Sequence, residues 1–181
     1  MHNKLVWLDL EMTGLDPKND VILEIACVVT DDALNVVAQA PSLLIKADEK
    51  KLSAMVPEVR TIHADSGLLS DLAHAMLTVQ QAEQKMLNFL REHCKQQTVP
   101  LCGNSIWMDK FFLKEHMPLL YNFFHYRTID VSSIKELVRR WYPNDAHAGF
   151  PKKNNHRALD DVYESIAELR HYQTYFFKKV D

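Results

Sequence analysis

The sequence is poor in glycine and cysteine, and it has no excess of positive charge. Only 4 of its 181 residues are glycine and 3 are cysteine, while 21 lysines and arginines stand against 24 aspartates and glutamates, for a net charge of −3. Tight binding of a long nucleic-acid duplex usually requires a strongly basic surface. The composition therefore does not favour a long-duplex binder, and it is neutral about an enzyme that grips a few phosphates through metal ions.

The odd number of cysteines argues against a disulfide framework. Cys27, Cys94 and Cys102 are far apart in the sequence, which suits buried free thiols in a reducing cytoplasm better than disulfides or a zinc site. The apolar segments are short and interrupted by charge, and the N-terminus has no secretory pattern. We therefore expect a cytoplasmic protein with neither a signal peptide nor a membrane partner.

A single domain over residues 1–181 is expected, because this length can bury a core and the sequence contains no linker or repeat. Apolar and β-branched runs predict strands over residues 5–10, 21–30, 36–46, 99–102 and 126–131. Periodic apolar stripes predict helices over residues 70–77, 78 to about 94, 105–117, 133 to about 141, and from about 159 onward. This order predicts an antiparallel meander within a mixed, five-stranded α/β sheet flanked by helices.

Polar residues mark the expected helix starts. Thr78 with Gln81, and Ser133 with Glu136, have the spacing of a capping box, and Ser105 is a further candidate cap. A polar stretch at residues 144–155 shows no periodicity and is expected to be a loop.

Asp9 and Glu11 are the most informative pair, because they stand at the end of an otherwise apolar strand. Residues two apart on a strand point to the same face, so the two carboxylates are expected side by side. Adjacent desolvated anions need a compensating cation or donor, and a hard divalent ion such as Mg²⁺ prefers carboxylate oxygens. The alternative is a solvated strand end.

A second candidate element is the hexapeptide HRALDD at residues 156–161, at the start of the last predicted helix. The loop before this helix can bring the imidazole of His156 over a metal ion that an aspartate binds. The apolar stripe of the helix does not determine whether Asp160 or Asp161 faces that site. Taken alone, both aspartates would be explained by the helix dipole, and His156 by a surface loop.

Asp109 is the third candidate, because it shares a helical stripe with Phe112 and Leu113 and is therefore expected on the buried side. The alternative is an exposed helical aspartate. All three elements lie at strand ends or helix starts, where sites in α/β sheets usually form. Their combination predicts a metal-dependent active site more strongly than any one of them.

These residues resemble the motifs of the histidine subtype of the DEDD exonucleases, a superfamily with an RNase H-like fold. Its Asp-x-Glu, mid-chain Asp and His-x4-Asp motifs match Asp9 with Glu11, Asp109, and His156 with Asp161. Longer segments are similar to the oligoribonuclease family over nearly the whole chain: WLDLEMTGLDP at 7–17, CGNSI at 102–106, FHYR at 124–127, and HRALDD. The dipeptide Trp107-Met108 departs from that family's pattern, and residues 50–64 match it loosely.

The resemblance implies a 3'→5' exoribonuclease that hydrolyses short oligoribonucleotides, above all dinucleotides, to 5'-nucleoside monophosphates. It implies two divalent ions, Mg²⁺ or Mn²⁺, bound by Asp9, Glu11, Asp109 and Asp161, with His156 as the general base. An imidazole suits that role because it titrates near neutrality.

Five further residues gain roles only from the resemblance. Leu15 would act as an apolar wedge against the terminal bases, and Ser105, Ser132 and Arg127 would clasp the 5' phosphate and so shut out longer RNA. Tyr126 would reach the catalytic site from the partner subunit of a homodimer. The simpler alternatives are turn packing for Leu15, a surface salt bridge for Arg127 and a core aromatic for Tyr126.

The homodimer likewise follows from the resemblance, and the aromatic stretch YNFFHY at residues 121–126 is the candidate interface, unless it is buried in the monomer core. Two other functions compete with the leading one. One is a proofreading or tRNA-trimming 3'→5' exonuclease of the same superfamily, which usually lacks the FHYR stretch. The other is an inactive nucleic-acid-binding relative, against which the intact motif set argues.

Overall fold

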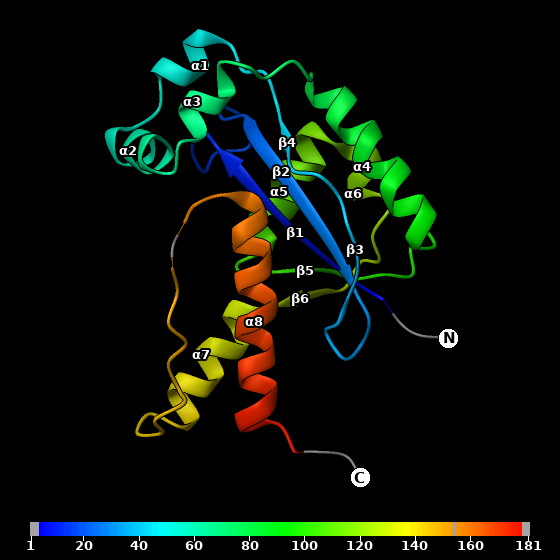
Figure 1. Cartoon of the computed structure of the whole chain (residues 1–181), viewed down its shortest axis with the longest axis vertical. Helices are drawn as coiled ribbons and strands as arrows, with labels where there is room; N and C mark the ends of the chain where they lie inside the picture. The colour runs from blue at the N-terminus through cyan, green and yellow to red at the C-terminus, as the bar shows by residue number, and fades with distance from the viewer. Residues whose placement is uncertain (1–3, 154, 179–181) are drawn as a thin grey trace.

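The computed structural model describes residues 4–153 and 155–178, and its centre is a mixed sheet flanked by helices (Figure 1). The sheet has six strands: β1 (Leu5–Met12), β2 (Ile22–Thr30), β3 (Val36–Gln39), β4 (Leu43–Leu44), β5 (Leu101–Gly103) and β6 (Thr128–Asp130). Their order is β3-β2-β1-β5-β6, and β4 also pairs with β2. The predicted α/β class is thus confirmed.

The sixth strand arises because the third predicted strand is divided. β2 pairs antiparallel with β1, β3 and β4, as a meander requires. Between β3 and β4 the chain passes through Pro41, which has no N–H to give to a ladder. The expectation of one continuous strand over residues 36–46 was therefore wrong. On the other side of β1 lies β5, which pairs parallel with β1, and β6 in turn pairs parallel with β5.

Eight helices are present in the described residues: α1 (Glu49–Ser53), α2 (Pro57–Asp65), α3 (Leu68–Leu72), α4 (Val79–His93), α5 (Trp107–His116), α6 (Pro118–Tyr121), α7 (Val131–Trp141) and α8 (Ala158–Phe176). The short helices α1, α2 and α6 were not predicted. Within the described residues, no helix combines the length and the apolar character that a membrane span needs.

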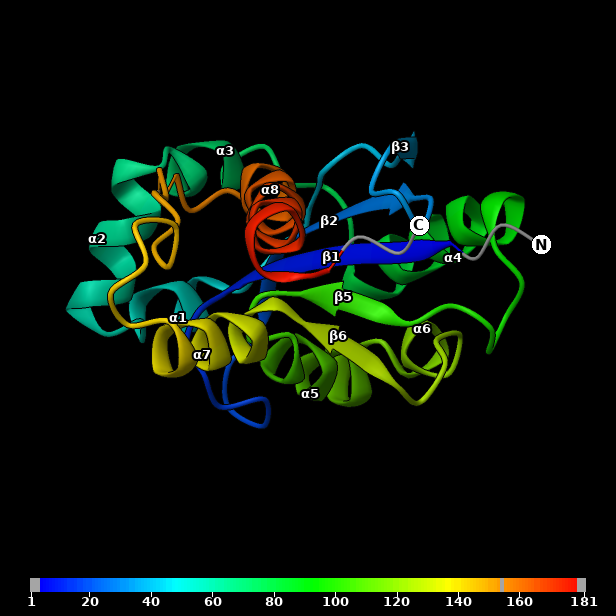
Figure 2. The ribbon, with the colours of Figure 1, turned by 90° about the horizontal axis from the view of Figure 1, so that it is seen from below.

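Helices α4 to α8 cover the two opposite faces of the sheet (Figures 1 and 2). On one face, α4, α5 and α6 enclose a core that includes Val6, Leu8 and Leu10 of β1. On the other face, α7 and α8 pack around Trp7. Side chains alternate along a strand, so Asp9 and Glu11 share the face of Trp7 and point to the side on which α8 lies.

Helices α1, α2 and α3 gather beyond the end of β1 and form a small cluster of their own (Figure 1). Their apolar contacts centre on Leu23, Met55 and Leu68, all of them buried. Helix α2 begins at Pro57 in its first turn, where the missing N–H of proline costs nothing. This cluster places α2 and α3 near the acidic end of β1.

Two of the three expected helix caps differ in the structure. The capping box of Thr78 and Gln81 is confirmed at the start of α4. Helix α7, however, begins at Val131, and its cap is Asp130, whose carboxylate accepts from the Ser132 N–H, so the box expected from Ser133 was wrong. Ser105 caps no helix, because α5 begins at Trp107 without a side-chain cap.

β1 extends beyond its parallel neighbour. β5 pairs only with Val6 and Trp7, whereas β1 continues to Met12. Beyond Leu8, the backbone groups on this edge of β1 have no strand partner from β5. The open edge gives other elements access to the acidic end of β1, and α5 lies on this side (Figure 2).

Phe112 and Phe111 are neighbours on α5 that test this packing. Phe112 is fully buried, and Phe111 is 53% exposed. Phe112→Ala should lower the free energy of unfolding by about 3–5 kcal/mol, because it leaves a cavity in the core, whereas Phe111→Ala should cost less than about 1 kcal/mol. Urea titration followed by circular dichroism measures both. Equal losses in the two variants would contradict the packing of α5.

Candidate active site

Three carboxylates from two elements meet at the end of β1. Asp9 and Glu11 come from the strand, and Asp161 comes from the first turn of α8. Their closest oxygen atoms all lie within 4.8 Å of one another. The pairing of β1 with β2, and the burial of Ala158 and Val162 against the sheet, hold the two elements in this register. The donors are all carboxylate oxygens, which fits a hard divalent cation.

Asp109 joins the group from α5 on the open edge of β1. Its Oδ1 accepts a hydrogen bond of 2.9 Å from the backbone N–H of Leu10. This N–H has no partner in β5, because β5 ends before it reaches Leu10. The side chain is buried, as its stripe with Phe112 and Leu113 predicted. One oxygen of Asp109 is thus committed to the strand, and the residue lies beside the three-carboxylate cluster rather than within it.

Burial disfavours the charged state of all four carboxyl groups. Burial is the largest cause in each case, and neighbouring carboxylates add to it at Asp9 and Glu11. The pKa of Glu11 rises to about 8, that of Asp109 to about 7, and that of Asp161 to about 6. The pKa of Asp9 is also raised. A bound cation would relieve this repulsion directly.

His156 stands directly before α8 in a left-handed backbone conformation, with φ of 51°. Burial raises the pKa of Asp161, and the charge of His156 opposes that rise, which is consistent with an imidazole on the side of the cluster. Asp160 points elsewhere, because its Oδ2 accepts a hydrogen bond from Asn155 at 3.0 Å. The sequence pattern left open which of the two aspartates faces the site, and in the structure it is Asp161.

Comparison with known proteins identifies the family. An exonuclease family model matches residues 6–169. A curated oligoribonuclease from Hydrogenovibrio crunogenus is 49% identical over 97% of this chain and 95% of its own length. The mitochondrial oligoribonuclease of Mus musculus is 46% identical over 99% of this chain and 76% of its own length. The chain belongs to the oligoribonuclease family.

Solved structures show that the fold of this family member is shared with larger exonucleases. Exonuclease I from Methylocaldum szegediense superposes with a TM-score of 0.72 at 20% identity, over 97% of this chain and 41% of that one. E. coli exonuclease I in complex with a dT13 oligonucleotide gives 0.74 at 16% identity, over 97% of this chain and 42% of that one. The RNase H-like exonuclease fold expected from the motifs is therefore confirmed.

Ser105 and Ser132, two of the expected phosphate contacts, lie together at the ends of β5 and β6. The Ser105 N–H donates to Ser132 Oγ and to Asp130 Oδ1, each at 3.0 Å, and the two hydroxyl oxygens are 3.2 Å apart. Ser105 has a left-handed φ of 48°, so the backbone turns its N–H toward Asp130 instead of starting α5. The serines line an open groove of about 520 Å³ with Trp107 and Arg140.

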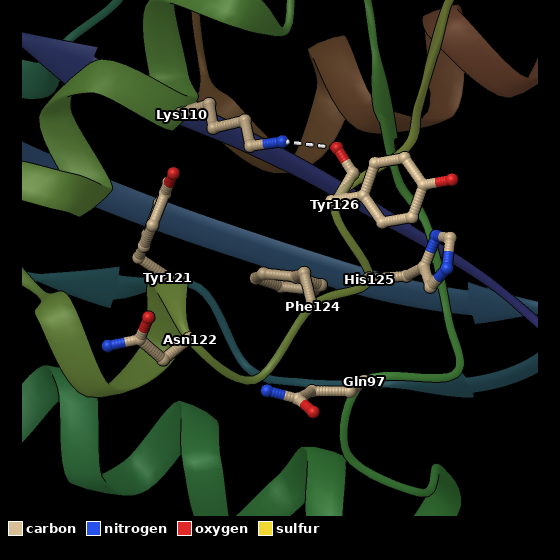
Figure 3. Close-up of a pocket in the computed structure, with 7 residues that line it drawn as sticks. All are labelled: Gln97, Lys110, Tyr121, Asn122, Phe124, His125 and Tyr126. Carbon is tan, nitrogen blue, oxygen red and sulfur yellow. Dashed lines mark hydrogen bonds between the residues drawn. The ribbon is translucent and has the colours of Figure 1, made fainter.

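Tyr126 and Arg127 lie in a different place from the serines within this chain. Arg127 is exposed, and its guanidinium lies 5.4 Å from the centre of the Tyr126 ring. Tyr126 is 72% exposed, so it is not a core aromatic. It borders a separate pocket of about 500 Å³, where Lys110 donates a 2.8 Å hydrogen bond to its carbonyl oxygen (Figure 3).

The aromatic stretch at residues 121–126 is divided between the core and the surface. Phe123 and Phe124 are buried, as the core alternative expected. Tyr121, His125 and Tyr126 line the pocket of Figure 3, together with one edge of Phe124. The core explanation thus holds for the two phenylalanines, and the interface explanation stays a prediction for the exposed Tyr126.

Leu15 is presented at the tip of the loop that follows β1. It is 68% exposed, so turn packing does not account for it. Asp20 ties the loop together by accepting from the Thr13 hydroxyl at 2.9 Å and from the Asp16 N–H at 3.0 Å. A side chain at Gly14 would meet the Asp20 carboxylate at 2.4 Å, so this carboxylate would have to leave its hydrogen bonds to make room. A fixed loop thus holds an apolar side chain beyond the acidic end of β1.

Sequence analysis missed His63 and Glu24, which both border the acidic cluster. His63 comes from α2 and is buried, with one ring nitrogen 2.8 Å from the Met12 carbonyl oxygen and the other 3.7 Å from Glu11. Glu24 lies directly opposite Glu11 in the β1–β2 register. A lone charge inside the apolar strand was a signal for Glu24, whereas His63 lies in a segment with no motif.

The crowding of carboxylates predicts how Glu11→Gln changes stability. An ordinary glutamate pKa of 4.5 is raised to about 8 in the folded state, so the folded protein holds this proton longer than the unfolded chain. The stability of the metal-free parent therefore falls as pH rises between these values. Glu11→Gln removes this penalty and should raise the Tm by a few degrees at pH 8, with a smaller gain near pH 5.

The same variant should lose most of the stabilisation that Mn²⁺ gives the parent, since one ligand is removed. Glu92→Gln, on the exposed face of α4, serves as the control and should leave both quantities unchanged. Thermal melts with EDTA or Mn²⁺ at the two pH values measure these shifts. A full Mn²⁺ shift in Glu11→Gln would exclude Glu11 as a ligand.

Proposed function

We propose that this chain is a 3'→5' exoribonuclease that hydrolyses short oligoribonucleotides, especially dinucleotides, to 5'-nucleoside monophosphates. The observation that carries the proposal is the convergence of Asp9, Glu11 and Asp161 within 4.8 Å, in a member of the oligoribonuclease family. Residues 1–181 would act as one exonuclease domain, in line with the family match over residues 6–169. The free state of Cys27, Cys94 and Cys102 suits the reducing cytoplasm.

The acidic cluster would hold two divalent ions, Mg²⁺ or Mn²⁺. Asp9, Glu11 and Asp161 have the oxygen donors and the spacing for direct ligands. Asp109 has one oxygen bound to the Leu10 N–H, which leaves the other for a ligand or a bridging water. When bound, the ions would polarise the scissile phosphate and make the attacking water more acidic.

His156 is the proposed general base, and its ring nitrogen would accept the proton of the attacking water. Its place beside Asp161 supports this role, because the imidazolium formed would be stabilised by the adjacent carboxylates. His63 of α2 is buried, whereas His156 is partly exposed and can exchange its proton with solvent.

Substrate length would be limited by contacts at both ends of a dinucleotide. Leu15, fixed at the loop tip, would stack against the terminal bases. The hydroxyl groups of Ser105 and Ser132 would donate to the 5' phosphate. Arg127 lies away from these serines within one chain, so it would complete a charged cap from the second subunit of the dimer proposed below. A cap at this position leaves no room for a further nucleotide, which accounts for the preference for short RNA.

We further propose a homodimer in which Tyr126 of the partner subunit completes each site. Two observations support it. Tyr126 and Arg127 are exposed beside each other, away from the groove of Ser105 and Ser132 in the same chain. The pocket beside Tyr126 is lined by aromatic and polar side chains, a composition common at interfaces (Figure 3).

A length series tests the proposed activity. RNAs of two, four, seven and twenty nucleotides with a 5'-terminal phosphate should be cut with a kcat/KM that is highest for the dinucleotide, and EDTA should abolish cleavage. Chromatography of the released 5'-nucleoside monophosphates measures the rates. Faster hydrolysis of the longest strand would favour a proofreading or tRNA-trimming exonuclease, and no release at any length would favour an inactive relative.

The shared site predicts complementation between two defective chains. Tyr126→Ala and His156→Ala should each be nearly inactive on the dinucleotide. After dissociation and reassociation, an equal mixture should regain about a quarter of the parent rate, since half of the random dimers would contain one complete site. Size-exclusion chromatography monitors reassembly. Reassembled dimers without recovered activity would show that Tyr126 acts within its own chain.

A further inference from the structure

Glu24 is a buried carboxylate that the proposed reaction does not use. It is the one charged residue of β2, it is 1% exposed, and it stands opposite Glu11 on the neighbouring strand. A charge in such a place is costly unless hydrogen bonds and a partner compensate it. The groups that contact Glu24 therefore show how its charge is compensated and which elements it connects.

Both oxygen atoms of Glu24 are fully engaged. Arg157 Nε donates to Oε2 and Arg157 Nη2 to Oε1, each at 3.2 Å. The Ala158 N–H also donates to Oε2 at 3.2 Å, and the Ser42 hydroxyl donates to Oε1 at 2.6 Å. The two-pronged arginine contact fixes orientation as well as distance.

Glu24 also caps the start of α8, although it belongs to strand β2 and not to the residues before the helix. The residue before α8 is Arg157, which provides no side-chain cap of its own, and Glu24 accepts the first N–H of the helix instead. A local serine or aspartate would satisfy that N–H equally well. A cap from β2 also ties the start of α8 to the sheet that carries Asp9 and Glu11.

Arg157 is held from a second side by α3. Its Nη1 donates to Asp71 Oδ2 at 2.8 Å, so the guanidinium lies between two carboxylates from separate elements. The residue immediately before it is His156, with a left-handed φ of 51°. A non-glycine residue adopts this conformation rarely, so contacts on either side that hold it in place are informative.

We propose that the Glu24–Arg157 pair is a positioning device, which fixes the backbone after His156 and thereby directs the imidazole toward the acidic cluster. The inference rests on the proposed function, because it assigns His156 the general-base role. Glu24 and Arg157 touch neither substrate nor reacting atoms, and they act through His156. Asp161 is less dependent on the pair, since the packing of Val162 and Ile166 against the sheet holds α8 along its length.

Substitution of Arg157 should affect turnover and metal binding differently, and the two can be measured separately. Arg157 carries a positive charge that acts on Glu11, so its removal should make the cluster more attractive to cations, not less. Loss of the arginine is therefore expected to lower turnover while leaving Mn²⁺ binding at least as strong as in the parent. A residue that merely stabilised the whole site would weaken both.

Arg157→Ala should lower kcat for the dinucleotide about 10- to 100-fold, the usual range for partners that orient an active-site group. KM should rise less than about 3-fold, and the Mn²⁺ dissociation constant from calorimetry should be equal to that of the parent or lower. Arg157→Lys keeps the charge but loses the two-pronged contact, and its kcat should be intermediate. Arg91→Ala removes an exposed arginine from the last turn of α4 and serves as the matched control, with parental kcat.

A double-variant cycle shows whether Arg157 acts through His156. In a His156→Ala background, Arg157→Ala should reduce the residual kcat less than about 3-fold, because the group it positions is already absent. Circular dichroism verifies that each variant is folded. If Arg157→Ala does not fold, Arg157→Lys decides: a reduced kcat supports the proposal, and a parental kcat overturns it.

Three results would overturn the positioning role. These are an unchanged kcat in folded Arg157→Ala, a loss of Mn²⁺ affinity as large as the loss of kcat, and independent effects of the two substitutions in the cycle. Failure of the proposed function would look different, because the parent itself would then not hydrolyse the dinucleotide, or His156→Ala alone would retain full turnover.

Discussion

Repulsion between carboxylates at the end of β1 is the constraint on which the rest of the structure depends. Asp9 and Glu11 share one face of the strand, and α8 brings Asp161 to within 4.8 Å of them. Burial raises the pKa of each group, and repulsion from neighbouring carboxylates adds to the rise at Asp9 and Glu11. The fold holds these groups together with extensive packing elsewhere, and a divalent cation would turn the repulsion into binding energy.

The sheet makes this arrangement possible by leaving one edge of β1 open. β5 is short, and beyond it Asp109 bonds the strand through the Leu10 N–H. On the opposite edge β2 continues alongside, and Glu24 turns the start of α8 toward the cluster. Strand pairing, helix capping and site geometry are therefore linked, because the same few polar groups serve all three.

Sequence patterns predicted the elements whose side chains follow a local period, and they missed what depends on distant contacts. The face shared by Asp9 and Glu11 follows from strand alternation, and the burial of Asp109 from its helical stripe. The cap of α7 was misassigned because Asp130 and Ser133 are both acceptable caps locally. Glu24 and Arg157 lie 133 residues apart, so no window of sequence shows that they meet. The family motifs supplied the choice of Asp161, which hydrogen bonding of Asp160 to Asn155 explains physically.

The most direct test of the account is the anomalous X-ray scattering of Mn²⁺ in crystals of the protein, recorded without substrate and with a non-hydrolysable dinucleotide. We expect manganese peaks bounded by the oxygen atoms of Asp9, Glu11 and Asp161, with the His156 imidazole directed toward them. Manganese bound elsewhere on the chain, with these three carboxylates free of metal in both crystals, would contradict the central claim.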